Sequence, residues 1–362
     1  MQHNFSTRGI SMGRFKPALS LLGVAFLSFI LCGAQKAGTK KAPSSEKPLP
    51  IPQVFRTQDW LASNVDSVAL WRNPKGGALL FVTAKEAHVV YVCDGLTGTL
   101  LSTLGKQGKG LGEFLRPNGV AVVDDYLIVT ERDNHRVQVF DLPSLKTVLF
   151  FGQDVLLKPY GLTVFRKDEA YELYVTDDYD VGNLGARVKH FRLTKTNGLL
   201  DAKLIRSFGE LKGPGALRTV ESILADPARD TLFICDEATN ELKVYTLAGD
   251  FTGRTLGKGL IKYEPEGLAL FEDRSAPAGG WLVVTDQGLK LTVLRIFTRD
   301  GSKYIGPVTG QPILANTDGI TLSPGDLGPF KRGALFCVHN DIRVQAYSWA
   351  DVERTLHLRD GK

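Results

Sequence analysis

Cysteine is scarce in this chain, and its few cysteines follow neither a disulfide framework nor a metal-binding pattern. The 362 residues contain four, at positions 32, 93, 235 and 337. No CxxC pair occurs and no histidine lies near one in a repeated spacing, which argues against a zinc site built from thiolates. Cys93, Cys235 and Cys337 each stand late in an apolar run (VVYVC, TLFIC and ALFC), so we expect small buried side chains there.

Long apolar runs are also lacking. The longest, residues 18–31, has about 14 residues, fewer than the roughly 20 that a helix needs to cross a bilayer. It follows Arg8, Arg14 and Lys16 with no acidic residue before it, which is typical of a secretory signal. We therefore expect residues 1–34 to be a signal peptide and the protein to be secreted or periplasmic. Lipid attachment at Cys32 is less favoured, because the bulky Leu31 precedes it.

Positive charge is not concentrated in any stripe. Residues 1–34 carry three positive charges and no negative one, so their removal lowers the formal net charge from +5 to +2. A nucleic-acid partner would require a basic surface that the sequence does not provide. Residues 35–52 are rich in Lys, Pro and Ser and are expected to form a flexible linker.

Six stretches of the sequence share one plan. Each has an apolar run, a polar turn, a second run that ends in a polar or acidic residue, and a third, alternating run. They are residues 67–92, 118–140, 160–193, 220–245, 266–297 and 318–347. Short β-branched and aromatic runs between Gly, Pro, Asp and Asn turns predict strands, and the best helix candidate is the short SWADVERTL near the C-terminus. The pattern predicts an all-β fold, a monomeric six-bladed β-propeller over residues 53–362. Either VFRTQDWLA or the tail after Ala350 is expected to close its ring.

Acidic residues recur at the start of the first run of several repeats. In a propeller these first strands line the central channel, so their first residues are expected to meet at one mouth. The expected members are Tyr160, Glu221, Glu266 and Asp318, with a neighbouring rim at the ends of the second runs formed by Lys85, Arg132, Asp177, Asp178, Asp236, Glu237 and Asp286.

Converging carboxylates repel one another, by about 4 kcal/mol for two unit charges about 4 Å apart at an effective dielectric constant of 20. A bound cation relieves this repulsion. Ligands that are all oxygen, at irregular spacing, favour Ca²⁺ over Zn²⁺. The two cations nearby, Lys85 and Arg132, further suggest a site for phosphate.

These residues and the blocks around them resemble the β-propeller phytases, calcium-dependent enzymes that release phosphate from inositol hexakisphosphate. The likeness covers roughly residues 64–348 and is clearest in DSVALWRNPKGG, VESILADPARDTLFICDEA, YEPEGLAL and NTDGITLSPGDLGPFKRGALFCVHND. The resemblance implies a phosphomonoesterase in which a metal-activated water attacks phosphate. It further implies calcium held by Glu221, Glu237, Glu264, Glu266, Asp318 and Asp66, substrate phosphate held by Lys85, Arg132 and Tyr160, and Glu221, Glu266 and Tyr160 as the catalytic residues.

The chain departs from the phytase pattern at three places. The opening acidic pair is reduced to Asp66 and Ser67, Asp178 stands where a second phosphate-binding lysine is usual, and the acid-rich loop is replaced by the uncharged GQPILAN. Fewer ligands and cations leave open a less charged ester as substrate, or a retained fold without catalysis.

Two other functions remain open at this point. The spacing of apolar and polar residues in RPNGVAVVDDYLIVTERDNHRVQVFDL resembles that of an NHL repeat, which suggests a non-catalytic secreted propeller that acts as a binding scaffold. A lactonase propeller also places acids around a metal, although Lys85 and Arg132 suit an anionic substrate better than a neutral ring.

Overall fold

The structure, a computed structural model, describes residues 46–182 and 184–359, and these residues belong to one compact unit. The expected signal peptide, residues 1–34, lies outside the described residues. Within the described ranges, no helix is long and apolar enough to cross a membrane.

Four of the sheets are antiparallel, with strands that follow one another in sequence. Each of these sheets has four strands. The first contains β2 (Val65–Arg72), β3 (Ala78–Ala84), β4 (Val89–Asp94) and β5 (Leu100–Leu104), and the second contains β6 (Pro117–Val123), β7 (Tyr126–Glu131), β8 (Arg136–Asp141) and β9 (Lys146–Phe151). The third contains β10 (Pro159–Lys167), β11 (Ala170–Asp177), β12 (Val188–Thr196) and β13 (Leu199–Phe208), and the fourth contains β14 (Val220–Asp226), β15 (Thr231–Asp236), β16 (Glu241–Tyr245) and β17 (Phe251–Leu256).

A larger, eight-stranded sheet joins the two ends of the chain. Its order is β18 (Glu264–Glu272), β19 (Gly280–Gln287), β20 (Val293–Thr298), β21 (Tyr304–Gln311), β1 (Leu49–Arg56), β24 (Arg343–Ser348), β23 (Gly333–His339) and β22 (Ile320–Pro324). The helices are short: α1 (Trp349–Thr355), η1 (Leu184–Ala186), η2 (Pro227–Arg229), η3 (Glu237–Thr239) and η4 (Pro277–Gly279). Helix α1 falls within the predicted candidate SWADVERTL.

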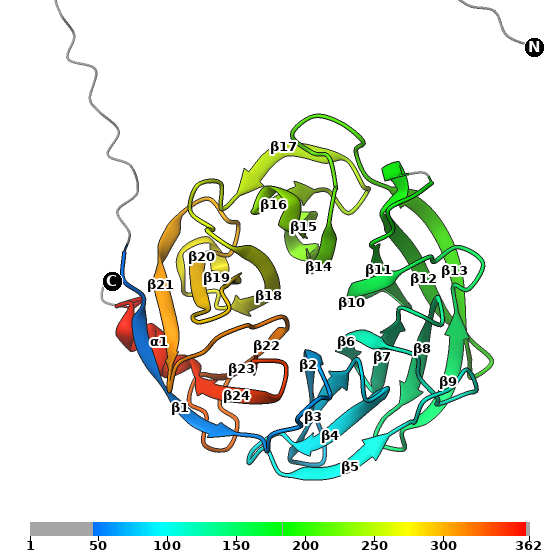
Figure 1. The fold of residues 1–362 in the computed structure, drawn as a ribbon, viewed down its shortest axis with the longest axis horizontal. Helices are drawn as coiled ribbons and strands as arrows, with labels where there is room; N and C mark the ends of the chain where they lie inside the picture. The colour runs from blue at the N-terminus through cyan, green and yellow to red at the C-terminus, as the bar shows by residue number, and fades with distance from the viewer. Residues whose placement is uncertain (1–45, 183, 360–362) are drawn as a thin grey trace, which may run out of the picture. The chain divides into compact units, whose positions relative to one another are not determined.

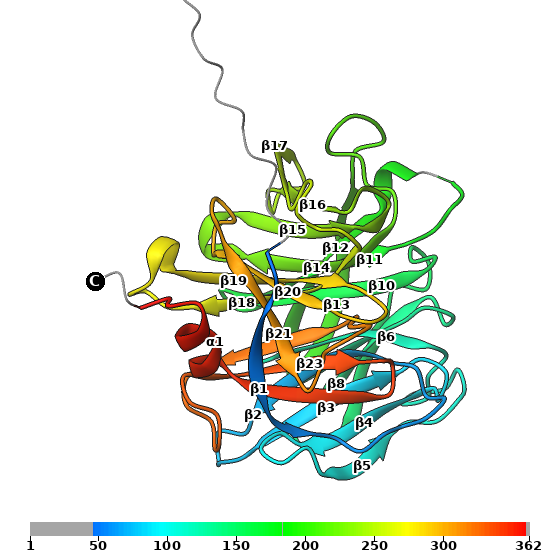
Figure 2. The ribbon, with the colours of Figure 1, turned by 60° about the vertical axis from the view of Figure 1, so that its left-hand side comes forward.

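Strand β1 closes the ring. Its first half pairs in parallel with β21, from Leu49 opposite Val308, and its second half pairs antiparallel with β24, from Gln53 opposite Tyr347. The N-terminal segment therefore makes the closure, and α1 lies outside it beside β1 (Figures 1 and 2). The boundary expected between linker and propeller shifts from residue 53 to Leu49, because residues 49–52 pair with β21.

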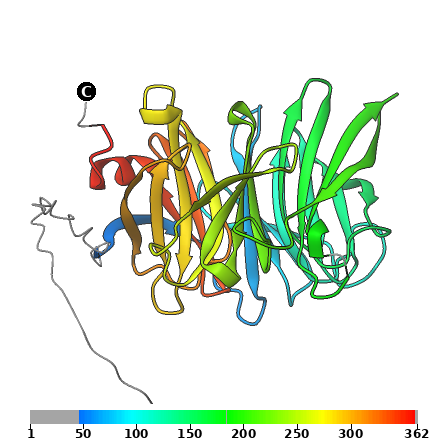
Figure 3. The same ribbon diagram turned by 90° about the horizontal axis from the view of Figure 1, so that it is seen from above.

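The sheets stand around a central channel as in a β-propeller (Figure 1), and Figure 3 shows them upright from another side. Strands β2, β6, β10, β14, β18 and β22 lie innermost, and residues of all six line the channel. The apolar core lies between neighbouring sheets, where Val68 and Leu80 of one sheet pack with Phe336 and Val344 of the next. Burying these faces against each other is what drives the sheets into a closed ring.

Candidate metal and anion site

One short motif recurs where each innermost strand begins. A polar residue is followed by Gly or Ser and then by an apolar residue, and the last two line the channel in every case. The six polar residues, which we call the channel ring, are Asp66, Asn118, Tyr160, Glu221, Glu266 and Asp318. In β2, β6, β10, β14 and β18 the pairing register shifts at this motif. A bulge re-aims the side chain next to it, which explains how the same turn of each strand can present its polar residue to the channel.

Hydroxyl and thiol groups of the second strands fix the backbone of the channel ring. In the best example, Thr176 Oγ1 accepts a bond from Gly161 N–H at 2.8 Å and donates to the carbonyl oxygen of Glu221, in the next sheet, at 2.6 Å. Equivalent donors reach the next carbonyl along the ring: Thr83 to Asn118 at 2.6 Å, Thr130 to Tyr160 at 2.5 Å and Cys235 to Glu266 at 3.1 Å. Four of the six ring residues, Asn118, Tyr160, Glu221 and Glu266, are therefore held by two sheets. The three described cysteines are buried and unpaired, as the sequence predicts.

Three glutamates form the acidic cluster of the site. One carboxylate oxygen from each of Glu221, Glu237 and Glu266 lies within 4.8 Å of the other two. Burial raises the pKa of Glu266 well above its usual value, and the charges of Glu221 and Glu237 raise it further. Burial likewise raises the pKa of Glu221 and of Glu237. Oε1 of Glu237 is buried and has no hydrogen-bond partner among the described residues.

A buried cation stands beside this cluster. Lys85 Nζ lies 2.5 Å from Asp66 Oδ2 and 3.4 Å from the hydroxyl of Tyr160. Burial by itself would lower the pKa of Lys85, but Asp66, Asp318 and Glu221 more than offset it and the net pKa is raised. Burial also raises the pKa of Tyr160, so this hydroxyl keeps its proton and remains a donor.

Asp318 completes the ring on the other side of Asp66. Its Oδ1 accepts a hydrogen bond from the Gln287 side chain. Burial raises the pKa of Asp318, and the nearby charge of Asp66 adds to this. The charge of Asp341 also raises the pKa of Asp318, and Asp341 accepts a hydrogen bond from the Asn316 side chain at 2.8 Å.

Other residues expected at the site have different positions. Arg132 is paired with its neighbour Asp133 at 2.7 Å and makes no hydrogen bond or ion pair with the ring within the described residues. Glu264 is exposed at the first position of β18, whereas Glu266, two residues later, is buried. Asp178 is bound by Arg187 at 2.9 Å.

Three aspartates that the sequence placed on the rim have a structural task instead. Asp177, Asp236 and Asp286 accept backbone N–H bonds from the segments that lead into β10, β14 and β18. Asp286 also pairs with Arg295 at 2.5 Å. The residue after two of them, Glu237 and Gln287, is the one that meets the acids of the ring.

Sequence reasoning missed Asn118, Gln287 and Asp341. Asn118 is fully buried, and neither side-chain atom has a partner among the described residues. It could have been found from NGV, which matches EGL and DGI of the later repeats.

The donor set fits a hard divalent cation. It consists of carboxylates, the unpartnered Glu237 Oε1 and an unpartnered amide, and these are oxygen ligands that Ca²⁺ accepts. Cys235 is no alternative ligand, because burial raises the pKa of its thiol and its Sγ already donates to Glu266. A cation among these acids would remove the repulsion that burial strengthens.

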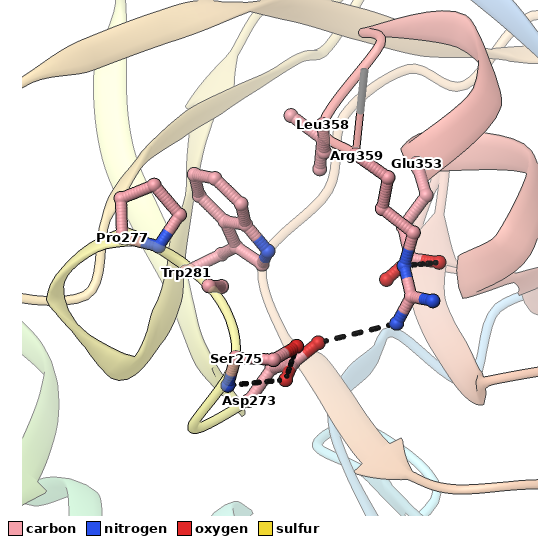
Figure 4. A pocket seen from close by; sticks show the side chains of 8 residues that line it. Asp273, Ser275, Pro277, Trp281, Glu353, Leu358 and Arg359 are labelled. Atoms are coloured by element: carbon pink, nitrogen blue, oxygen red, sulfur yellow. Dashed lines mark hydrogen bonds and ion pairs between the residues drawn. The ribbon is translucent and has the colours of Figure 1, made fainter. Parts of the chain in front are cut away.

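The channel beneath the ring has a volume of about 60 Å³, enough for a few water molecules but not for an organic ester. A hollow of about 500 Å³ lies at the opposite end of β18, lined by Trp281 and Pro277 (Figure 4). Its charged groups already satisfy one another, since Arg359 pairs with Asp273 at 3.3 Å and with Glu353 at 3.2 Å. It contains no channel-ring residue, so we do not assign the site there.

Comparison with known proteins identifies one repeat family. Residues 114–140, which include most of the second sheet, match the NHL repeat. No curated protein matches the chain. None of the comparisons points to the phytases.

Solved structures with a similar chain course share little sequence with this protein. Hydrazine synthase from Kuenenia stuttgartiensis is 15% identical, with a TM-score of 0.48, over 77% of this chain and 75% of that one. An inactive virginiamycin B lyase from Staphylococcus aureus with quinupristin is 14% identical, with a TM-score of 0.47, over 80% and 87%. A nidogen/laminin complex is 16% identical, with a TM-score of 0.47, over 73% and 86%.

Proposed function

We propose that this protein is a secreted, calcium-dependent phosphomonoesterase of phytase type. The observation that carries the proposal is the convergence of Glu221, Glu237 and Glu266 within 4.8 Å, beside the buried cation Lys85. In this proposal the eight-stranded sheet counts as two blades, which makes the propeller six-bladed, with β1 as the outermost strand of the last blade.

Calcium would be held by Glu221, Glu237 and Glu266, with Asp66, Asp318 and the exposed Glu264 around them. When bound, it supplies positive charge for the phosphoryl oxygens and makes a water molecule a better nucleophile. Without that charge the acids of the ring would repel a phosphate, since Lys85 is the one buried cation among them in the described residues.

The protein's own residues then orient the ester. Tyr160 donates a hydrogen bond from its hydroxyl to a phosphoryl oxygen, and Lys85 turns from Asp66 towards the same group. Both side chains come from different sheets and already lie 3.4 Å apart, so they form one preorganised anion contact. Arg132 can join them only by releasing Asp133.

The test is phosphate release from phytate and from 4-nitrophenyl phosphate by the purified protein, in calcium and in chelator. We expect release that needs calcium and disappears in Glu221→Gln. The matched control is Glu169→Gln, since the Glu169 side chain is 97% exposed. A folded protein that binds calcium yet releases phosphate from neither ester would overturn the proposal.

The NHL match supports a second candidate, a secreted binding scaffold without catalysis. In that case the acidic cluster would hold a structural cation. Calcium would then raise the thermal stability of the protein, whereas neither ester would be hydrolysed.

A further inference from the structure

A hollow of about 700 Å³ opens at the same end of the strands as the channel ring. Its walls come from the segment that enters β18 and from the loop between β19 and β20, and include Lys262, Tyr263, Glu264, Gln287, Leu289 and Lys290. We propose that it binds the organic part of an anionic ester that has an apolar body and a second negative group. This inference rests on the proposed function, because it names the class of substrate for that site.

The hollow is continuous with the site through shared residues. Gln287 lines it and donates to Asp318 of the channel ring. Asn316 lines it and donates to Asp341 at 2.8 Å. Because the channel itself has only about 60 Å³, the bulk of an ester whose phosphate reaches the ring must lie outside, and this hollow is large enough to take it.

The walls offer an apolar surface that is exposed in the protein. Leu289 is 82% exposed and Tyr263 is 55% exposed. Covering such side chains removes apolar area from water, which favours an aromatic or alkyl group in the ligand. A polyol phosphate such as phytate does not present one.

The same walls carry two positive charges. Lys262 and Lys290 are exposed, and no ion pair is found for either within residues 46–182 and 184–359. Each can therefore bind a carboxylate or phosphate of the ligand without first losing a partner. Glu264 adds a negative charge on the side facing Glu237, and this charge helps to raise the pKa of Glu237.

The wall at Tyr263 is fixed before any ligand arrives. Asp286 Oδ1 accepts the backbone N–H of Tyr263 at 2.8 Å and that of Lys262 at 3.1 Å, and Asp286 is itself held by Arg295. Gly288 fits this place because a Cβ there would lie 2.4 Å from the carbonyl oxygen of Leu291 and 3.2 Å from the Tyr263 ring. A rigid wall loses little freedom on binding, which favours a specific ligand.

The experiment compares a carboxynaphthyl phosphate with methyl phosphate, in calcium, and measures binding of the matching carboxynaphthyl phosphonate by calorimetry. In a Lys262→Ala/Lys290→Ala variant we expect KM for the naphthyl ester and Kd for the phosphonate to rise about tenfold or more, while kcat and methyl phosphate turnover stay unchanged. Tyr263→Ala should weaken the binding of the naphthyl ester and phosphonate and leave methyl phosphate turnover unchanged. Lys258→Ala, an exposed lysine outside the hollow, is the control.

Equal phosphonate Kd values in the wild type and the double lysine variant would overturn the inference, even with calcium-dependent hydrolysis intact. If no ester is hydrolysed, the proposed function fails instead. Calorimetry then still decides the inference, because it needs no turnover.

Discussion

Replacing Thr176 by Val tests the idea that neighbouring sheets hold the ring residues in place. Valine has the same shape but lacks the hydroxyl, so the variant loses the bonds to Gly161 N–H at 2.8 Å and to Glu221 O at 2.6 Å. Thr176 is fully buried, so water cannot replace these bonds. Leaving a buried donor and a buried acceptor unpaired costs about 1–3 kcal/mol each, and we expect a loss of about 2–6 kcal/mol in the free energy of unfolding.

The same change should loosen Glu221. Loss of a residue that positions a metal ligand typically weakens metal binding about 10–100-fold, so we expect the calcium Kd to rise by that factor. Urea denaturation measures the stability and calorimetry measures the Kd. Thr176→Ser keeps the hydroxyl and should stay within about 1 kcal/mol, and Thr103→Val, at an exposed site on β5, should change stability by less than about 0.5 kcal/mol.

Thr176→Val with the wild-type calcium Kd would refute the reasoning about positioning, whatever its stability. Wild-type stability together with a weakened Kd would instead refute the energetic argument, because two buried unpaired groups would then cost nothing measurable.

Three further changes test other parts of the site. Burial raises the folded-state pKa of Glu221, Glu266 and Asp318 above the value of about 4 expected in the unfolded chain, so the folded protein retains protons that the unfolded chain has lost. The free energy of unfolding in chelator should therefore be greatest at the acidic end and fall as pH rises from about 4 through the raised pKa values. Saturating calcium should make it depend less on pH. Urea denaturation from pH 4.5 to 8 checks this, and a free energy of unfolding that rises with pH in chelator would contradict it. Asn118→Leu removes unpartnered polar atoms, so stability without calcium should not drop by more than about 1 kcal/mol while calcium or phosphate binding weakens; unchanged binding by calorimetry would show that Asn118 contacts neither. Lys85→Met leaves Asp66 as an uncompensated buried charge and should lower the free energy of unfolding by about 3–5 kcal/mol. The double variant Lys85→Met/Asp66→Asn should recover most of this loss in urea denaturation, and failure to recover it would argue against the ion pair.

The sequence alone determined the strands and the position of the polar motif. Its period-two runs and turn residues are local signals, so they predicted the sheets, the scarce helix and the buried cysteines correctly. The recurrence of an acid before Gly at Glu266 and Asp318 placed these residues at one mouth, because every repeat enters the channel at the same point of its first strand.

The tertiary structure alone decided which neighbouring acids face each other. Glu264 and Glu266 are two residues apart, yet only Glu266 is buried in the ring, because the bulge after Pro265 breaks the simple alternation of the strand. Likewise Asp236 clamps the chain entering β14 while the next residue, Glu237, meets Glu221 and Glu266. The contact of Glu266 with Glu221 and Glu237 joins two sheets, so it exists only once these sheets have packed side by side around the channel.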